Sequence, residues 1–257
     1  MNTQKKVGII QFPGSNCERE TAFALKQLDI DVHYIRWNQE KHIKNMHALV
    51  LPGGFSFQDR IRSGAIASKL PLSSHIITAA KKGVPILGIC NGCQILAEMG
   101  LIPDLNNTSS LSCAFSNNRK NQQNSGFTCD WTYVCIKQSD KNIFTQNLPE
   151  EIAIPIQINH QEGRFVTDIS QESLESACSI MYYCDAKVSI CSDFPTNPNG
   201  SRYNIAGIGN KAGNVFAMMP HPERAISSYQ IPSWIEAPKD PLWTHFFSAL
   251  TRNAAYA

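Results

Sequence analysis

Val84-Pro-Ile-Leu-Gly-Ile-Cys90-Asn-Gly-Cys-Gln94 is the stretch that decides the fold. Its first part, 84–89, is apolar and too short for a helix, which predicts a buried strand. The residues from Gln94 onward are good helix formers, and Gly100 is a suitable C-cap. Between strand and helix lies a G-x-C-x-G pattern, the cysteine form of a nucleophile elbow, where a sharp turn lifts one side chain over the sheet edge. Its two glycines leave room for a strained backbone at Cys90.

This placement predicts a reactive thiol at Cys90. A helix N-terminus carries partial positive charge and free N–H groups, which favour a thiolate and a neighbouring oxyanion. Two other interpretations remain open at this point. Cys90 could be a buried small hydrophobe, the usual fate of a free cysteine. Cys90 and Cys93 also have the C-x-x-C spacing of redox and metal sites.

Composition narrows the class of protein. The chain has 257 residues, 42% of them hydrophobic and 17% charged, which is typical of a globular protein. A formal net charge of +2 gives no electrostatic reason to expect a nucleic acid or a membrane surface as partner. The nine cysteines are irregularly spaced, nothing at the start resembles a signal peptide, and no apolar run approaches the length of a membrane span, so we expect reduced thiols in the cytoplasm.

Strands and helices alternate in the first hundred residues. We expect strands at 6–12, 32–37 and 47–51, and helices at 18–28 and from His75, the latter capped by Ser73 or Ser74; a short helix is expected at 59–70. This order predicts an α/β fold with an open, mostly parallel sheet flanked by helices. Ligands of such sheets bind at the carboxyl ends of the strands, where Gly53-Gly54 and Cys90 would share one crevice.

The second half has a weaker pattern. Asn106–Gly126 is polar, carries the basic pair Arg119-Lys120, and is expected to be a long loop. Further strands are expected at 127–137, 154–159, 177–183, 205–208 and 215–219, and a final helix at 241–250. These strands predict a smaller β region in addition to the parallel sheet. Without a linker or repeat, residues 1–257 are expected to form one domain.

His221-Pro222-Glu223 supplies a second half for the site. Proline favours an extended residue before it, and in an extended H-x-E the two polar side chains point the same way. The carboxylate can then hold one imidazole nitrogen while the other takes a proton from a thiol, the logic of a catalytic triad. His160 is a rival base, with Glu162 as the acid that could orient it.

Several further motifs identify a resemblance. They are Gly14-Ser-Asn-Cys17, Pro52-Gly-Gly-Phe-Ser56, Asp59, Gly64-Ala-Ile-Ala67, Gly88-Ile-Cys-Asn-Gly92, Gln94, Asn197-Pro-Asn-Gly-Ser201, Ile205-Ala-Gly-Ile208, Gly213-Asn-Val-Phe216 and Met218-Met-Pro-His-Pro-Glu-Arg-Ala225. With them, nearly the whole chain resembles the glutaminase subunits of phosphoribosylformylglycinamidine synthase, which are class I (triad) glutamine amidotransferases of purine biosynthesis with a flavodoxin-like fold.

The resemblance implies a role for each matching position. Cys90 corresponds to the nucleophile, His221 to the general base and acid, and Glu223 to its orienting carboxylate. The backbone of Gly54 and Phe55 and the Asn91 N–H correspond to an oxyanion hole, and Gln94 and His160 to substrate-binding residues. No metal site is implied.

The implied reaction is hydrolysis of L-glutamine through a Cys90 thioester, with ammonia passed to a separate synthetase subunit and a small third subunit as a further candidate partner. ATP and Mg²⁺ are expected on that synthetase and no cofactor on this chain, which has no G-x-x-x-x-G-K-[ST] motif. The alternatives are the glutaminase of another amidotransferase, a Cys90/Cys93 thiol–disulfide protein, and a non-catalytic subunit.

The chain departs from the family pattern at a few positions outside the proposed triad. Phe57-Gln58 stands where Tyr-Gly is common, and Asp130, Gln161 and Ala217 replace Arg, Gly and Gly. Of these changes, Gln58 and Asp130 bear on contacts with a partner. Cys93 stands at a usually apolar position, which favours packing over redox chemistry.

Overall fold

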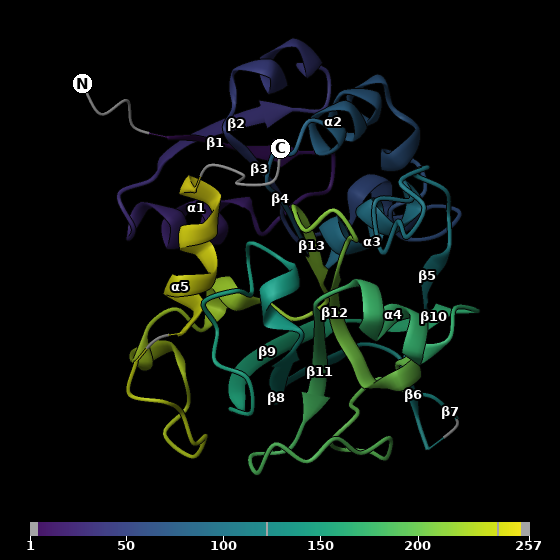
Figure 1. The fold of residues 1–257 in the computed structure, drawn as a ribbon, viewed down its shortest axis with the longest axis vertical. Coiled ribbons are helices and arrows are strands. Elements are labelled where there is room, and N and C mark those ends of the chain that lie inside the picture. The colour runs from purple at the N-terminus through teal and green to yellow at the C-terminus, as the bar shows by residue number, and fades with distance from the viewer. Residues whose placement is uncertain (1–4, 122, 241, 253–257) are drawn as a thin grey trace.

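The computed structural model describes residues 5–121, 123–240 and 242–252, and its main feature is a sheet of nine strands (Figure 1). In spatial order these strands are β2 (Asp31–Arg36), β1 (Lys6–Gln11), β3 (Ala48–Leu51), β4 (Ile86–Ile89), β13 (Val215–Met218), β12 (Ile205–Gly209), β11 (Ile180–Cys184), β8 (Thr128–Lys137) and β9 (Ile154–His160). The fold class expected from the sequence, an α/β fold with a sheet flanked by helices, is confirmed.

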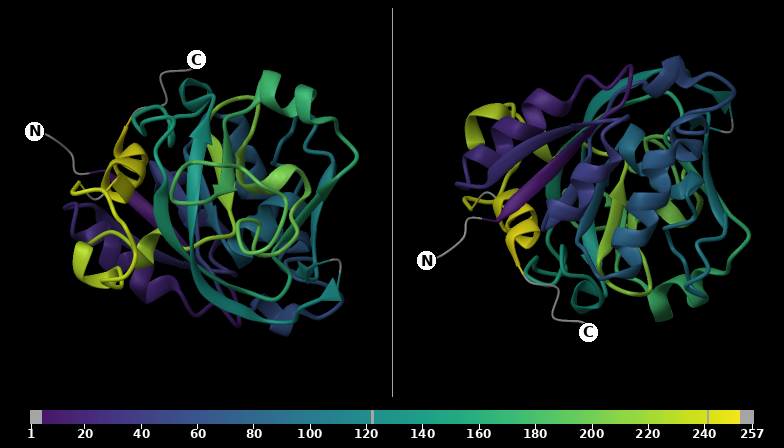
Figure 2. Two further views of the ribbon diagram at one scale, coloured as in Figure 1. Left: turned by 90° about the horizontal axis from the view of Figure 1, so that it is seen from below. Right: turned by 90° about the horizontal axis from the view of Figure 1, so that it is seen from above.

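The first five strands of this order form a parallel half. β1 pairs with β2 and β3, and β4 pairs with β3 and β13, all in parallel. Figure 2 shows helices packed around these strands. The α-helices of the described chain are α1 (Glu18–Lys26), α2 (Pro71–Lys81), α3 (Asn91–Glu98), α4 (Gln171–Ala177) and α5 (Leu242–Ser248). β3 and β4 are buried along their whole length, as strands covered on both faces must be.

The remaining strands form an antiparallel half that curves back on itself. β12, β11, β8 and β9 follow β13 with antiparallel pairing throughout. Gln157 of β9 then pairs with His221, three residues after β13 ends, and the His221 N–H donates to the Gln157 carbonyl at 2.8 Å. The far end of the sheet therefore returns to the carboxyl end of β13, next to β4 and Cys90.

The expected loop Asn106–Gly126 is only partly a loop. It contains β5 (Cys113–Ser116), which pairs antiparallel with β10 (Arg164–Thr167), and the two-residue strands β6 (Arg119–Lys120) and β7 (Gln123–Asn124), which pair with each other. The expectation failed because β5 is stabilised by a partner about fifty residues away, which a local pattern of polar residues does not reveal.

Three other expectations are corrected. Residues 59–70 form no α-helix: the backbone has positive φ at Gln58, Asp59 and Ile61, and only short 3₁₀ turns form, at Ser56–Asp59 and Ala67–Lys69. Helix α2 begins at Pro71, which suits the first helical position because its missing N–H would be unpaired there anyway. The expected strand at 177–183 runs instead from 180 to 184, because α4 occupies the preceding turn.

The sequence pattern missed α4, which Ser170 caps by accepting a hydrogen bond from the Ser173 N–H. The final helix agrees with expectation from Leu242 onward, while Pro241 lies outside the described residues. Within the described ranges, no helix is both long enough and apolar enough to cross a membrane.

Candidate active site

Cys90 lies in the sharp turn between β4 and α3. Its backbone has φ 51° and ψ −109°, a strained conformation for a residue with a side chain. The flanking glycines are required by close contacts: a Cβ on Gly92 would lie 1.9 Å from the Leu51 carbonyl oxygen, and one on Gly88 would lie 2.8 Å from the Gly92 oxygen. The elbow predicted from G-x-C-x-G is therefore present.

His221 and Glu223 form a buried pair just after β13. The imidazole Nδ1 and the Glu223 Oε1 are 2.6 Å apart, and both side chains are almost fully buried. The geometry differs from the expected extended H-x-E. His221 is extended, but Pro222–Arg224 form a 3₁₀ turn that brings the carboxylate back to the ring.

The pKa of His221 reflects this pairing. Burial, the largest single influence, would lower it, but the negative charge of Glu223 and the contributions of Cys90 and Cys17 together outweigh burial and hold the pKa well above its usual range. The Nε2 atom is buried without a hydrogen-bond partner among the described residues. The ring nitrogen that faces the thiols can therefore hold the proton that a thiol gives up.

One cavity of about 250 Å³ brings these groups together. Cys90, His221, Gln94, His160 and Gly54 all line it. The Cys90 thiol also points toward the Asn159 carbonyl at the end of β9, at 3.7 Å. Groups more than a hundred residues apart in the chain thus meet at the carboxyl ends of β3, β4 and β13.

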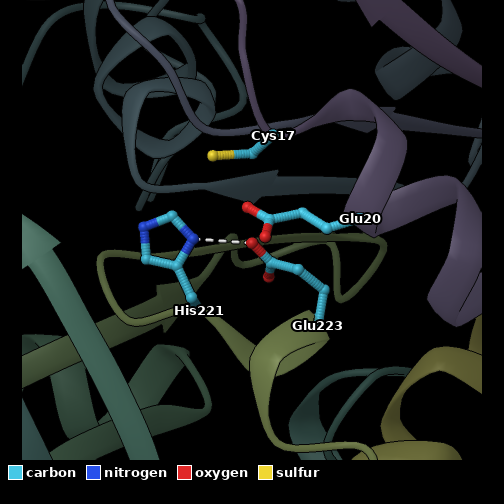
Figure 3. A group of neighbouring side chains, drawn as sticks. All are labelled: Cys17, Glu20, His221 and Glu223. Carbon is cyan, nitrogen blue, oxygen red and sulfur yellow. Dashed lines mark hydrogen bonds and ion pairs between the residues drawn. The ribbon is translucent and has the colours of Figure 1, made fainter.

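A second thiol, that of Cys17, lies beside His221. Figure 3 shows Cys17 and Glu20, from the start of α1, facing His221 and Glu223. Their potential ligand atoms all lie within 4.8 Å of one another, a spacing that could suggest a metal site. However, Arg224 donates to both Glu20 oxygens and, at 3.5 Å, to the Cys17 sulfur.

The guanidinium of Arg224 therefore already supplies the positive charge that a metal would bring to this cluster. Burial raises the pKa of the Cys17 thiol to about 11, so Cys17 stays protonated at neutral pH. Arg224 also donates to the Gln157 side chain at 3.0 Å. The cluster ties α1, β9 and the histidine turn together as an ion-pair network.

His160 has a different environment from the one considered for a rival base. Burial, and then the charge of His221, lowers its pKa to about 3, which keeps it neutral. Its Nδ1 lies 3.1 Å from the Asn118 side-chain oxygen, which also accepts from the Gly163 N–H. Glu162 does not orient it, since that carboxylate accepts from the Ser63 backbone and hydroxyl.

Polar groups line the side of the cavity beyond the thiol. Gln94 donates to the Glu162 carbonyl at 2.7 Å and accepts from the Asn91 side chain at 3.0 Å. Asp59 lines the same wall, and burial, together with the nearby charge of Glu162, raises its pKa to about 6. Two carboxylates, those of Asp59 and Glu162, thus face one end of the cavity.

The expected oxyanion donors are only partly free. The Phe55 N–H donates to the Gly14 carbonyl at 2.9 Å, so the expectation for Phe55 is corrected: this donor is already used. The N–H groups of Gly54 and Asn91 have no acceptor among the described residues. Gln58, which replaces a common glycine of the family pattern, adopts φ 59°, the left-handed region in which glycine costs least.

Cys93 is not part of the cavity. It is fully buried in the core, burial raises its pKa well above the usual range, and all nine cysteines are free thiols. Sequence reasoning missed roles for Cys17, Glu20, Arg224, Asn118 and Asp59. Cys17, Asp59 and Arg224 stood inside quoted motifs, but their partners are distant in the chain and only the fold reveals them.

A buried thiol–imidazole–carboxylate arrangement at the elbow of an α/β sheet defines a class of cysteine-dependent enzymes of the triad type. The comparisons with known proteins identify the family of the chain. Residues 4–253 match the model of the CobB/CobQ-like glutamine amidotransferase domain, and the chain belongs to this family.

Relatives and solved structures agree with this assignment. The chain is 39% identical to phosphoribosylformylglycinamidine synthase subunit PurQ of Methanothrix thermoacetophila, over 88% of this chain and 89% of the relative. It is 40% identical to the subunit of the same name from Aquifex aeolicus, over 86% and 91%. In the structure of PurLQS from Thermotoga maritima, one chain superposes with a TM-score of 0.74 at 29% identity, covering 96% of this chain and 98% of that one.

Proposed function

We propose that the chain is the glutaminase subunit of a phosphoribosylformylglycinamidine synthase in purine biosynthesis. The observation that carries this proposal is that Cys90 and His221 line one cavity, with Glu223 paired to His221, in a chain that matches PurQ subunits along most of its length. The name of those relatives describes a subunit of a synthase, and we propose the other subunits of that synthase as partners of this chain. The whole chain acts as one glutamine amidotransferase domain.

The chemistry begins with Cys90 as a thiolate whose proton is held on Nε2 of His221, an arrangement that the raised pKa of the imidazole favours. The thiolate attacks the side-chain amide carbon of L-glutamine, and the N–H groups of Gly54 and Asn91 are the free donors beside the developing oxyanion. His221 then gives its proton to the departing ammonia, leaving a Cys90 thioester. Water, losing a proton to His221, hydrolyses the thioester to glutamate. Glu223 holds the ring and stabilises its charged form throughout.

The far end of the cavity suits the rest of the glutamine molecule. The carboxylates of Asp59 and Glu162 are positioned to meet an ammonium group, and Gln94 and His160 to form the wall beside it. The Ser63 hydroxyl donates to the Glu162 carboxylate, and the Gln94 side chain donates to the Glu162 backbone carbonyl. These hydrogen bonds order the wall before the substrate binds.

The ammonia passes to a synthetase subunit, which binds ATP and Mg²⁺ and converts formylglycinamide ribonucleotide to its amidine. The structure of PurLQS is consistent with a synthetase partner and with a small third subunit. Nine free thiols suit the reducing cytoplasm, which we propose as the location.

The test is Cys90→Ala in the complex with the synthetase. Glutamine-dependent synthesis should be lost, while synthesis from added ammonia should remain, because ammonia bypasses the thioester. Cys17→Ala is the matched control: it removes the neighbouring thiol on the same histidine and should keep glutamine-dependent synthesis. Normal glutamine consumption by Cys90→Ala would overturn the proposal.

A further inference from the structure

Three arginines line a second cavity, which none of the triad residues lines. Arg119, Arg164 and Arg202 line a space of about 260 Å³. The first two lie on the strands β6 and β10, which are labelled in Figure 1. Gly200 lies between two of them: a Cβ added there would meet Arg119 Cβ at 3.2 Å and Arg164 Cδ at 3.5 Å. The cations are therefore gathered by the fold around one loop.

These arginines are poorly neutralised. Among the described residues none of the three forms an ion pair with a carboxylate within 4.0 Å, although Asp193 also lines the cavity. Within the described ranges the Arg119 side chain has no hydrogen bond, and the guanidinium of Arg202 lies over the Tyr203 ring, 5.0 Å from its centroid, with no hydrogen bond of its own.

Arg164 is anchored differently. It donates to the Asn117 carbonyl and to the Ser116 hydroxyl, both at 3.1 Å. Burial, and then the charge of Arg119, lowers its pKa, which shows that the two guanidinium groups act on each other. One arginine is thus fixed, and two keep free donors.

A larger cavity adjoins the first. It measures about 790 Å³, shares Arg164, Gly200 and Arg202 with the arginine cavity, and is otherwise lined by apolar and hydroxyl groups and by Asp168. Leu111 and Val166 offer apolar surface, and the Asp168 carboxylate offers an acceptor for hydroxyl groups. Arg164 and Arg202 therefore border both the arginine cavity and a cavity lined by apolar and polar groups.

We propose that the arginine cavity binds the phosphate of a sugar phosphate or nucleotide, whose organic part occupies the adjoining cavity. Planar guanidinium groups bind phosphate oxygens in pairs, and free donors converging from separate segments suit a tetrahedral dianion better than a single planar carboxylate. The site is distinct from the glutamine cavity and does not depend on its chemistry.

The test is isothermal titration calorimetry of the full chain in phosphate-free, low-salt buffer, with ribose 5-phosphate, AMP and inorganic phosphate as probes. We expect saturable binding of the two organic phosphates, tighter than that of inorganic phosphate. The double variant Arg119→Gln/Arg202→Gln should weaken this binding at least tenfold. Both side chains are exposed, so the variant should unfold at the temperature of the parent.

Arg36→Gln is the matched control, because Arg36 is an exposed arginine on β2, an edge strand of the nine-stranded sheet, and lines neither cavity. It should leave binding unchanged, and an equal loss in this control would reduce the effect to net charge and overturn the proposal. Absence of saturable binding would overturn it too, as would equal affinity for inorganic phosphate. Loss of synthetase association in the double variant, with phosphate affinity unchanged, would assign the arginines to a protein contact instead.

Discussion

The parallel and antiparallel halves of the sheet contribute different parts of the active site. The parallel half carries the reacting groups, with Cys90 after β4 and the pair His221 and Glu223 after β13. The antiparallel half returns β9 to the same edge and supplies His160 and Glu162, which contact no part of the His221–Glu223 pair by hydrogen bond. The difference predicts that changes in the first half alter kcat and changes in the second alter KM.

Among the changes that test this difference between the halves, the largest effect is expected for Glu223→Gln. An amide cannot stabilise the charged imidazole, so kcat should fall by at least about 10²-fold, the contribution typical of a positioned proton-transfer group. Steady-state glutaminase kinetics in the synthetase complex measure this loss, and the KM for glutamine should change little.

Glu20→Gln is the matched control, since Glu20 lies in the same cluster but pairs with Arg224 and not with the imidazole. It should cost less than about tenfold in kcat, because only positioning is affected. Comparable losses in both variants would mean that the cluster acts as a whole and that Glu223 has no special part.

The antiparallel wall is tested by Asn118→Ala. The change removes the acceptor shared by His160 and the Gly163 N–H and leaves buried polar groups unpaired, at about 1–3 kcal/mol each. We expect KM for glutamine to rise about tenfold, equivalent to about 1.4 kcal/mol, with kcat within about threefold. Asn117→Ala is the control: it changes an exposed neighbour and should match the parent in both kcat and KM. If Asn118→Ala lowered kcat without raising KM, the proposed division between the two halves of the sheet would be wrong.

Asp59 is an exception to this division: it belongs to the parallel half, yet it lines the end of the cavity where we place the ammonium group of glutamine. Its pKa of about 6 lies above the ordinary value, so the carboxylate is lost as pH falls through 6 rather than through 4. Binding of an ammonium group needs the ionised form, and KM should therefore rise about tenfold between pH 7 and pH 5. In Asp59→Asn, KM should be high at both pH values; a pH dependence identical to the parent's would remove Asp59 from substrate binding.

The same division explains what the sequence could predict. The elbow at Cys90 was predictable because strand, turn and helix are continuous, and its glycines report local crowding. His221 and Glu223 were predictable as a pair because they are two residues apart. The network of Cys17 and Arg224 was not, because it joins residues over two hundred positions apart, and neither was β5, whose partner is β10. The curvature that brings β9 back to His221 depends on the whole antiparallel half and has no local signature.

Cys93→Ala should give the smallest effect. Cys93 is close to Cys90 in sequence, but its side chain is fully buried and outside the cavity, so the change should cost about 1 kcal/mol of unfolding free energy and leave kcat within about twofold. Chemical denaturation and glutaminase assays measure the two quantities. A complete loss of activity in a folded Cys93→Ala protein would revive a dithiol mechanism, because packing alone cannot make a core sulfur as necessary as the one at Cys90.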